Sequence, residues 1–177
     1  DEFSRRTLHW RIFLLALGAP FLLSLGDAPL FDVDEGAFAQ ASLEMWVSRD
    51  FGHTTLNGAD RFDKPMGVYW LQALAIALLG PTEWAVRLPS ALCAWALCVG
   101  VARFARDQWG RDTGLWAGAV LATSAGLLVI GRASTADALL NLCLGMTALA
   151  LWRHLESGSV SHLRRAVEPC QRLLAAA

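Results

Sequence analysis

Lysine is nearly missing from this chain of 177 residues, since Lys64 is the only one beside fourteen arginines. Charged residues make up 18% of the composition and hydrophobic residues 55%, which is less polar surface than a soluble domain of this length exposes. The four cysteines form no CxxC pair, so we interpret them as free thiols. No basic cluster interleaves with aromatic residues, and we therefore expect no nucleic-acid partner.

Common catalytic motifs are missing as well. The sequence contains no GxSxG, no P-loop and no paired cysteines, which excludes the commonest hydrolase, ATPase and redox classes. What the chain has instead is long apolar runs and a strong segregation of charge. Residues 27–83 hold nine acids against three basic residues, whereas the rest of the chain holds seven acids against twelve.

The apolar runs predict membrane-spanning helices, each of which needs ~20 residues to cross ~30 Å of hydrocarbon. We predict four spans, over residues 8–26, 84–102, 113–130 and 133–152. The first run also fits a cleavable signal peptide, but the later spans favour an uncleaved helix. Residues 66–80 are too short to span and predict an interfacial helix. The fold class expected is all-α, a polytopic transmembrane helical bundle formed by residues 1–155.

Basic residues decide the orientation, because cytoplasmic loops are enriched in arginine and lysine. If the four spans alternate, ten of the fifteen basic residues fall on one side. This predicts a cytoplasmic N-terminus, a cytoplasmic polar tail over 156–177 and an outer loop over 27–83. The arginine-heavy, alanine-rich composition suggests a bacterial inner membrane. Because the chain starts at Asp1 and ends at LLAAA, we expect it to be a fragment of a longer protein.

The outer loop is acidic and carries the first candidate residues. A helical pattern over 33–47 starts at Asp32, and Asp32 with Glu35 fits a capping box, which explains both as helix-starting residues. The capping box does not explain why an acid stands at Asp34. Carboxylates beside a membrane span are costly unless they are used, so Asp34 is a candidate catalytic residue.

Asp63 and Lys64 form the second candidate pair, directly before Pro65 and the predicted interfacial helix. A lone ammonium can hold a phosphate while the acid binds a divalent cation or orients the lysine. Arg132, in the next outer turn, is a candidate second phosphate partner. The alternatives are a surface ion pair for Asp63 and Lys64 and an interfacial anchor for Arg132.

Asp137 is the third candidate, since the predicted topology puts it at the same membrane surface as Asp34 and Lys64. Acids within apolar runs usually face a cavity or a partner. The alternative is a helix-capping acid, because Ser134 and Thr135 precede it.

The chain resembles the N-terminal part of GT-C membrane glycosyltransferases in the order of its motifs. These are an apolar span followed by DEGAFAQASLEM, RFDKPMGVYWLQAL, WAVRLPSAL and TADALLN. The bacterial aminoarabinose transferases and the dolichyl-phosphate-mannose-type transferases are the most similar, over about residues 8–152. The resemblance implies transfer of a sugar from a polyprenyl-phosphate carrier to a lipid, protein or glycan acceptor at the outer face. By motif position it implies Asp34 as catalytic acid with Glu35 beside it, Lys64 as carrier-phosphate ligand and Asp137 as second acid. Asp63 matches a position, usually glutamate, that binds a divalent metal in some members, and the shorter aspartate reduces its reach.

Our leading hypothesis is therefore the N-terminal part of an inverting, carrier-dependent glycosyltransferase that also contacts membrane lipids. Two alternatives come from other classes. One is a small transporter in which Asp137 and Arg132 line a polar pathway, and the other is a non-catalytic membrane assembly subunit.

Overall fold

A computed structural model of the chain describes residues 2–31 and 33–175, with side chains over 5–31 and 34–156. Asp32, the expected N-cap, lies outside the described residues. The chain divides into two compact units, Asp1–Cys143 and Leu144–Ala177. The first unit carries all elements but the continuation of the last helix. In chain order the elements are α1 (Glu2–Ala16), α2 (Ala19–Leu22), α3 (Val33–Ser48), β1 (Thr55–Leu56), β2 (Ala59–Asp60), α4 (Met66–Leu79), α5 (Glu83–Trp109), α6 (Arg111–Ala122), α7 (Ala125–Arg132) and α8 (Asp137–Ala175).

The first predicted span, 8–26, is divided between α1 and α2 instead of forming one helix. Pro20 has no N–H to continue the helical hydrogen bonds, which favours a break just before it. Gly18 lies at the break against Trp95, and a Cβ at Gly18 would come 3.0 Å from the indole ring. The Trp95 Nε1–H donates to the Leu14 carbonyl at 2.8 Å. The break is therefore a packed feature of the fold.

A short hairpin interrupts residues 27–83, for which the sequence predicts helices over 33–47 and 66–80 and no strand. Strands β1 and β2 pair antiparallel, with Thr55 opposite Asp60. Asn57 and Gly58 connect them, and both have positive φ, 53° and 76°. An Asn-Gly pair in this conformation is the preferred two-residue hairpin turn, so the signal was present in the sequence. Apart from this hairpin, every regular element in the described residues is helical.

The predicted span over 113–130 is two helices, α6 and α7, bent by 60° at Thr123 and Ser124. Both hydroxyls bond to carbonyls of the preceding turn, Thr123 Oγ1 to Ala119 at 2.8 Å and Ser124 Oγ to Leu121 at 2.8 Å. Such local side-chain bonds compete with continuation of the helix. Two helical segments of the described residues are long and apolar enough to cross a membrane, Glu83–Trp109 and Asp137–Glu156. If the bent pair α6 and α7 is counted as one span, the number of candidate membrane spans rises to three. The sequence predicted four spans.

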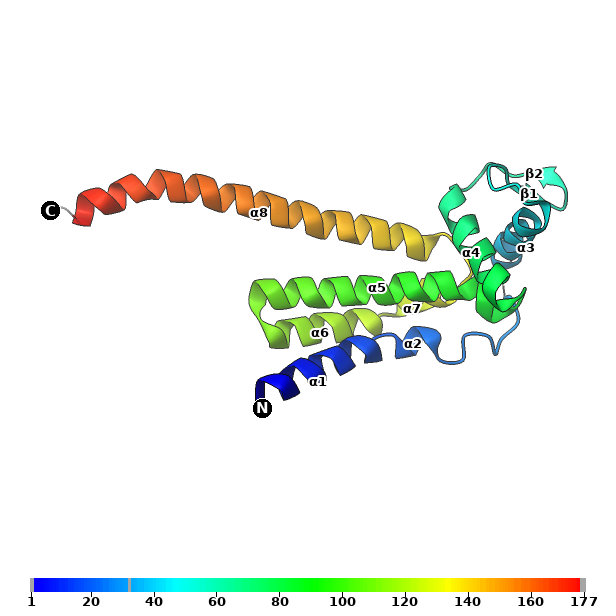
Figure 1. The fold of residues 1–177 in the computed structure, drawn as a ribbon, viewed down its shortest axis with the longest axis horizontal. Helices are drawn as coiled ribbons and strands as arrows, with labels where there is room; N and C mark the ends of the chain where they lie inside the picture. Colours follow the sequence, from blue (N-terminus) through cyan, green and yellow to red (C-terminus); the bar gives the residue numbers. More distant parts are fainter. Residues whose placement is uncertain (1, 32, 176–177) are drawn as a thin grey trace. The chain divides into compact units, whose positions relative to one another are not determined.

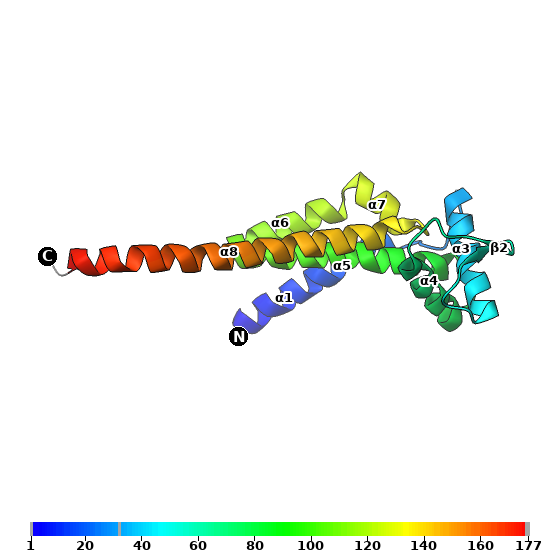
Figure 2. The same cartoon turned by 90° about the horizontal axis from the view of Figure 1, so that it is seen from above.

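Helices α5 and α6 form an antiparallel pair. Helices α3 and α4 and the hairpin lie together near the N-terminal end of α5 (Figures 1 and 2). One hydrophobic core joins α1 and α2 to α5, α6 and α7, and a second lies between α3 and α4. Gly114 and Gly118 of α6 are buried against α5. A Cβ at Gly114 would come 2.7 Å from the Ala102 carbonyl oxygen, which shows how closely the two backbones approach.

We expect Gly114→Ala to lower the unfolding temperature of the protein in detergent, because the added methyl group has no room between α5 and α6. Overpacking of this kind costs about 1–3 kcal/mol. Gly126→Ala is the matched control, since a Cβ there meets no atom within 4 Å and alanine favours a helix. Equal unfolding temperatures for the two variants would contradict the close packing.

Candidate active site

A cavity of about 400 Å³ opens where the first turn of α3, the start of α4 and the start of α8 meet. Three residues predicted from the sequence line it, namely Asp34 on α3, Lys64 just before α4 and Asp137 at the first position of α8. The rest of the wall is mostly apolar and consists of Phe38, Pro65, Val68, Thr135, Ala136, Leu139, Leu140 and Cys143. The fold thus brings two carboxylates and one ammonium, distant in sequence, to a single cavity.

Lys64 is exposed at this cavity, and its ammonium lies near one aromatic ring. Its Nζ lies 5.9 Å from the centroid of the Phe38 ring, and that ring stacks on Tyr69 with centroids 5.4 Å apart. A cation near an aromatic face is attracted by the ring quadrupole. Among the described side chains, no ion pair includes Lys64. The ammonium is therefore a candidate ligand for an anion.

Asp34 and Asp137 are both exposed and both lie in the first turn of a helix. Asp137 Oδ2 accepts a hydrogen bond from Thr135 Oγ1 at 3.3 Å. The N-terminal ends of α3 and α8 carry the positive ends of their dipoles, which stabilise carboxylates and attract anions. The capping alternative explains an acid in the first turn of α8, but it does not account for two acids lining one cavity with a lysine.

Glu35 is not one of the residues lining the cavity, although the sequence analysis placed it beside the catalytic acid. Its side chain is buried and pairs with Arg87 of α5, at 2.8 Å from Oε2 to Nη2 and 3.0 Å from Oε1 to Nε. Oε1 also accepts the Ser134 N–H at 2.7 Å, and Oε2 accepts the Phe31 N–H at 2.8 Å. Four donors engage the carboxylate, which supports a structural role for Glu35, and the catalytic role suggested by the sequence stays a prediction.

The pKa of Glu35 is set by this network. Burial by itself raises the pKa of the carboxyl group, but the hydrogen bonds from Arg87, Phe31 and Ser134 and the charge of Arg87 together outweigh burial. The pKa of Glu35 therefore lies below its ordinary value. The carboxylate stays ionised at neutral pH and keeps its pair with Arg87.

Arg87 uses all five of its N–H donors. Besides the two bonds to Glu35, Nη1 donates to the carbonyls of Leu25 at 3.1 Å and Ala28 at 2.7 Å, and Nη2 donates to that of Pro29 at 2.9 Å. The planar fork of arginine suits such multiple acceptors. The ion pair therefore joins α5 to the segment before α3 and to the turn before α8.

Arg132 does not line the cavity either. Its Nη1 donates to the carbonyls of Pro20 and Leu23, both at 2.8 Å, and its Nη2 to that of Ser24 at 3.1 Å. These carbonyls follow the break in the first helix, and that of Ser24 also accepts the Asp27 N–H at 3.5 Å. The geometry does not support Arg132 as a phosphate ligand, nor the transporter alternative in which Arg132 and Asp137 share one pathway.

Asp63 faces a cation instead of other carboxylates. Its Oδ1 lies 2.9 Å from Nε of Arg61, which also donates to the Tyr69 hydroxyl at 3.1 Å. Within the part of the chain that the structure describes, no group of three or more His, Cys, Asp or Glu side chains could hold a metal ion. The described residues therefore do not fit the divalent-metal site that the sequence suggested at Asp63.

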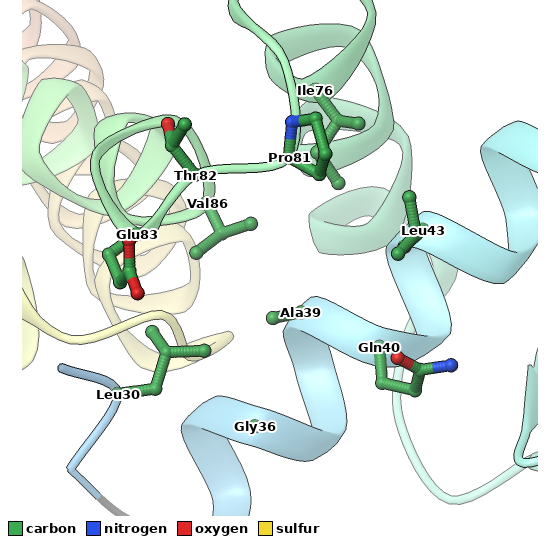
Figure 3. Close-up of a pocket in the computed structure, with 10 residues that line it drawn as sticks. All are labelled: Leu30, Gly36, Ala39, Gln40, Leu43, Ile76, Pro81, Thr82, Glu83 and Val86. Atoms are coloured by element: carbon green, nitrogen blue, oxygen red, sulfur yellow. The ribbon is translucent and has the colours of Figure 1, made fainter.

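A second cavity, of about 190 Å³, lies between α3, the end of α4 and the start of α5 (Figure 3). Figure 3 shows Ala39 and Leu43 of α3 across from Val86 and Glu83 of α5. Among its lining residues Glu83 alone is ionisable, and none of the predicted site residues is included. Because it combines no cation with its acid, it lacks the groups that the first cavity brings together.

Two residues that build the site were missed in the sequence. The sequence assigned no role to Arg87 or to Gln72. Both are nonetheless polar residues inside apolar runs, and such residues are almost always partnered when buried. That rule identifies them as structurally important, but it does not identify their partners.

The chain was next compared with known proteins. A family model described as dolichyl-phosphate-mannose-protein mannosyltransferase matches residues 63–167. An undecaprenyl phosphate-alpha-4-amino-4-deoxy-L-arabinose arabinosyl transferase 2 of Pseudomonas fluorescens is 33% identical over 150 residues, which are 84% of this chain and 26% of that protein. The corresponding transferase of Pseudomonas paraeruginosa is 33% identical over 157 residues, covering 87% of this chain and 28% of its own length.

The fold of the chain is also similar to solved structures of ArnT from Cupriavidus metallidurans. ArnT from Cupriavidus metallidurans in the apo state superimposes with a TM-score of 0.72 at 26% identity, covering 79% of this chain and 26% of ArnT. The same protein bound to undecaprenyl phosphate gives a TM-score of 0.72 and covers 77% of this chain. The chain thus spans about a quarter of the length of the relatives it matches. The family match, which covers more than half of the chain, and the shared helical fold show that this chain belongs to the dolichyl-phosphate-mannose-protein mannosyltransferase family of GT-C membrane glycosyltransferases.

Proposed function

We propose that this chain is the N-terminal part of a membrane glycosyltransferase that moves a sugar from a polyprenyl-phosphate carrier to an acceptor at the outer face of the membrane. The observation that carries the proposal is the single cavity lined by Asp34, Lys64 and Asp137. A phosphate leaving group needs a cation, and an acceptor hydroxyl needs a base. This cavity holds candidates for both.

The carrier that we propose is undecaprenyl phosphate. The relatives named above are undecaprenyl phosphate-linked aminoarabinose transferases, and a solved relative is bound to undecaprenyl phosphate. In this chain the carrier phosphate lies against the ammonium of Lys64, near the N-terminal ends of α3 and α8. The sugar that these names suggest bears an amino group, which as a cation suits a cavity with two carboxylates.

The reaction proposed is a displacement at the anomeric carbon with inversion. The acceptor oxygen forms a bond to that carbon while the bond from the carbon to the phosphate oxygen breaks, and the carrier phosphate leaves with the electron pair. Asp34 takes the proton of the acceptor hydroxyl, and Lys64 stabilises the charge that develops on the phosphate. If the acceptor is already an anion, Asp34 acts as an electrostatic partner. Asp137 holds the sugar from the side of α8.

We further propose that the protein lies in a bacterial inner membrane with its N-terminus in the cytoplasm. Residues 27–83 then face outward, together with the turn before α8. This orientation puts the cavity at the outer surface, where a lipid, protein or glycan acceptor can reach it. The distribution of basic residues supports it, because the arginine-rich segments then face the cytoplasm.

Lys64 provides the test of this function. In the protein purified from its native membranes, we expect Lys64→Met to lower kcat/KM for transfer from undecaprenyl-phosphate aminoarabinose by about 10²–10³, the usual effect of removing one group that stabilises developing charge. Lys64→Arg keeps the cation with different geometry, and its loss is expected to be smaller.

The matched control is Arg49→Met, which removes a cation at the far end of α3. Arg49 lies over the Trp46 ring at 3.6 Å and does not line the cavity. Transfer is measured from the labelled sugar recovered on the acceptor. Native activity in Lys64→Met, with the protein folded and inserted, would rule out the proposed phosphate site.

A further inference from the structure

Besides the Tyr69 hydroxyl and the Trp70 indole N–H, Gln72 is the only polar side chain in α4, and it is completely buried, with 0% of its surface exposed. A buried amide costs free energy unless its donors and acceptor are all bonded. An apolar residue would pack in the middle of this helix without that requirement. The bonds that Gln72 makes therefore indicate what it does.

The amide of Gln72 joins three other segments. Its Oε1 accepts from Ser42 Oγ of α3 at 2.7 Å, and its Nε2 donates to the Val86 carbonyl of α5 at 3.1 Å. The same Nε2 donates to Ser134 Oγ at 2.9 Å, in the turn between α7 and α8. Because the amide is planar, its three partners are held at fixed separations. The position of the turn is thereby set relative to α3 and α5.

Two other helices hold the same turn. The Ser134 N–H donates to Glu35 of α3 at 2.7 Å, and Ser90 Oγ of α5 donates to the Thr135 carbonyl at 3.2 Å. Ser134 itself is fully buried. The turn is therefore attached on its backbone by Glu35 and Ser90 and on its side chain by Gln72. If Gln72 is removed, the turn keeps its attachment but loses the contact that sets its position.

Asp137 directly follows this turn, and the position of its carboxylate depends on the position of the turn. Its carboxylate is exposed, and Thr135, within the same turn, donates to it. Its place in the cavity is therefore decided by the backbone at the start of α8. We propose that Gln72 is a positioning residue, which acts through Ser134 to place the Asp137 carboxylate against the substrate. This inference rests on the function proposed above.

The inference predicts an effect on turnover more than on carrier binding. In the protein purified from its native membranes, Gln72→Met keeps the side-chain length but removes the amide bonds. We expect kcat for transfer from undecaprenyl-phosphate aminoarabinose to fall roughly 10–100-fold, because small misplacements of reacting groups have effects of this size. KM for the carrier is expected to change less than threefold or so, since Lys64 lies on a different segment.

A double-mutant cycle separates positioning from general loosening of the fold. In an Asp137→Asn background, Gln72→Met is expected to add no further loss of kcat, because the group it positions is already gone. Full additivity of the two losses would overturn the inference. Gln40→Met, on the exposed face of α3, is the matched control and is expected to leave kcat unchanged.

Two further measurements make each outcome decisive. If Gln72→Met does not fold, Ser134→Ala removes only the bond to the turn and is expected to show the same loss of kcat and the same cycle. If Asp137→Asn transfers at the native rate while Lys64→Met does not, the positioning inference fails and the proposed function stands. If neither variant affects transfer, the proposed function itself fails.

Discussion

Arg87→Leu is expected to lower the stability of this protein by about 3–5 kcal/mol, the usual effect of breaking a buried ion pair from one side. The variant leaves Glu35 buried at 2% exposure without its partner cation. It also removes the donors to the carbonyls of Leu25, Ala28 and Pro29. For a chain of this size the loss corresponds to a fall in unfolding temperature on the order of 10 °C, measured by thermal unfolding in detergent.

Arg132→Leu is the matched control for this experiment. Arg132 also donates to three backbone carbonyls, but no carboxylate pairs with it in the described part of the chain. Its removal deletes hydrogen bonds without leaving a buried charge, so the expected loss is smaller, about 1–3 kcal/mol. If both variants unfolded at the same temperature, the pair of Glu35 and Arg87 would not be what holds residues 25–29 and α3 to α5.

The same pair predicts how stability depends on pH. Because the pKa of Glu35 is lowered in the folded protein, the carboxylate contributes stability above its ordinary pKa, about 4.3. That contribution is lost as the pH falls through the lowered, folded-state pKa. The wild type is therefore expected to lose stability in acid. In Glu35→Gln, which cannot ionise, this part of the pH dependence should be missing.

Asp34→Asn is expected to lower kcat/KM for sugar transfer by about 10²–10⁴, the range for removal of a general base. Asparagine keeps the size of the side chain but cannot accept the proton of the acceptor hydroxyl. Because Asp34 is exposed, the unfolding temperature is expected to stay unchanged. The measurement is transfer from the carrier-linked sugar by protein purified from its native membranes.

Asp50→Asn is the control for the loss of one acid from residues 27–83. Asp50 is exposed, accepts the Gly52 N–H at 3.0 Å and does not line the cavity. A folded, inserted Asp34→Asn variant with native activity would exclude Asp34 as the base. Tolerance of neutral residues at both Asp34 and Asp137 is what the assembly-subunit alternative predicts.

Much of the helical pattern was readable from the sequence. The helices expected over 33–47 and 66–80 correspond to α3 and α4, because apolar periodicity and the boundaries at Pro65 and Gly80 act locally. The breaks in the runs 8–26 and 113–130 were missed. Hydropathy is averaged over a window and is insensitive to single residues. Pro20 interrupts a helix because it lacks an N–H, and Thr123 and Ser124 do so because their hydroxyls bond to backbone carbonyls.

Part of the candidate site could also be predicted from the sequence, and part could not. Composition and the order of motifs were enough to single out Asp34, Lys64 and Asp137, which line one cavity. They were not enough to separate Asp34 from its neighbour Glu35. Both are acids in the first turn of one helix, and only the direction of each side chain and the presence of Arg87 distinguish them.

The sequence by itself determined that this chain is helical, apolar and charge-segregated, and it carried the motifs of its family. These properties depend on residue type and on spacing along the chain. Only the tertiary structure decided which polar groups meet, because Glu35 with Arg87 and Gln72 with Ser134 are joined across 52 and 62 residues. Hydrogen bonds over a few ångströms depend on how helices pack, and packing is a property of the whole fold.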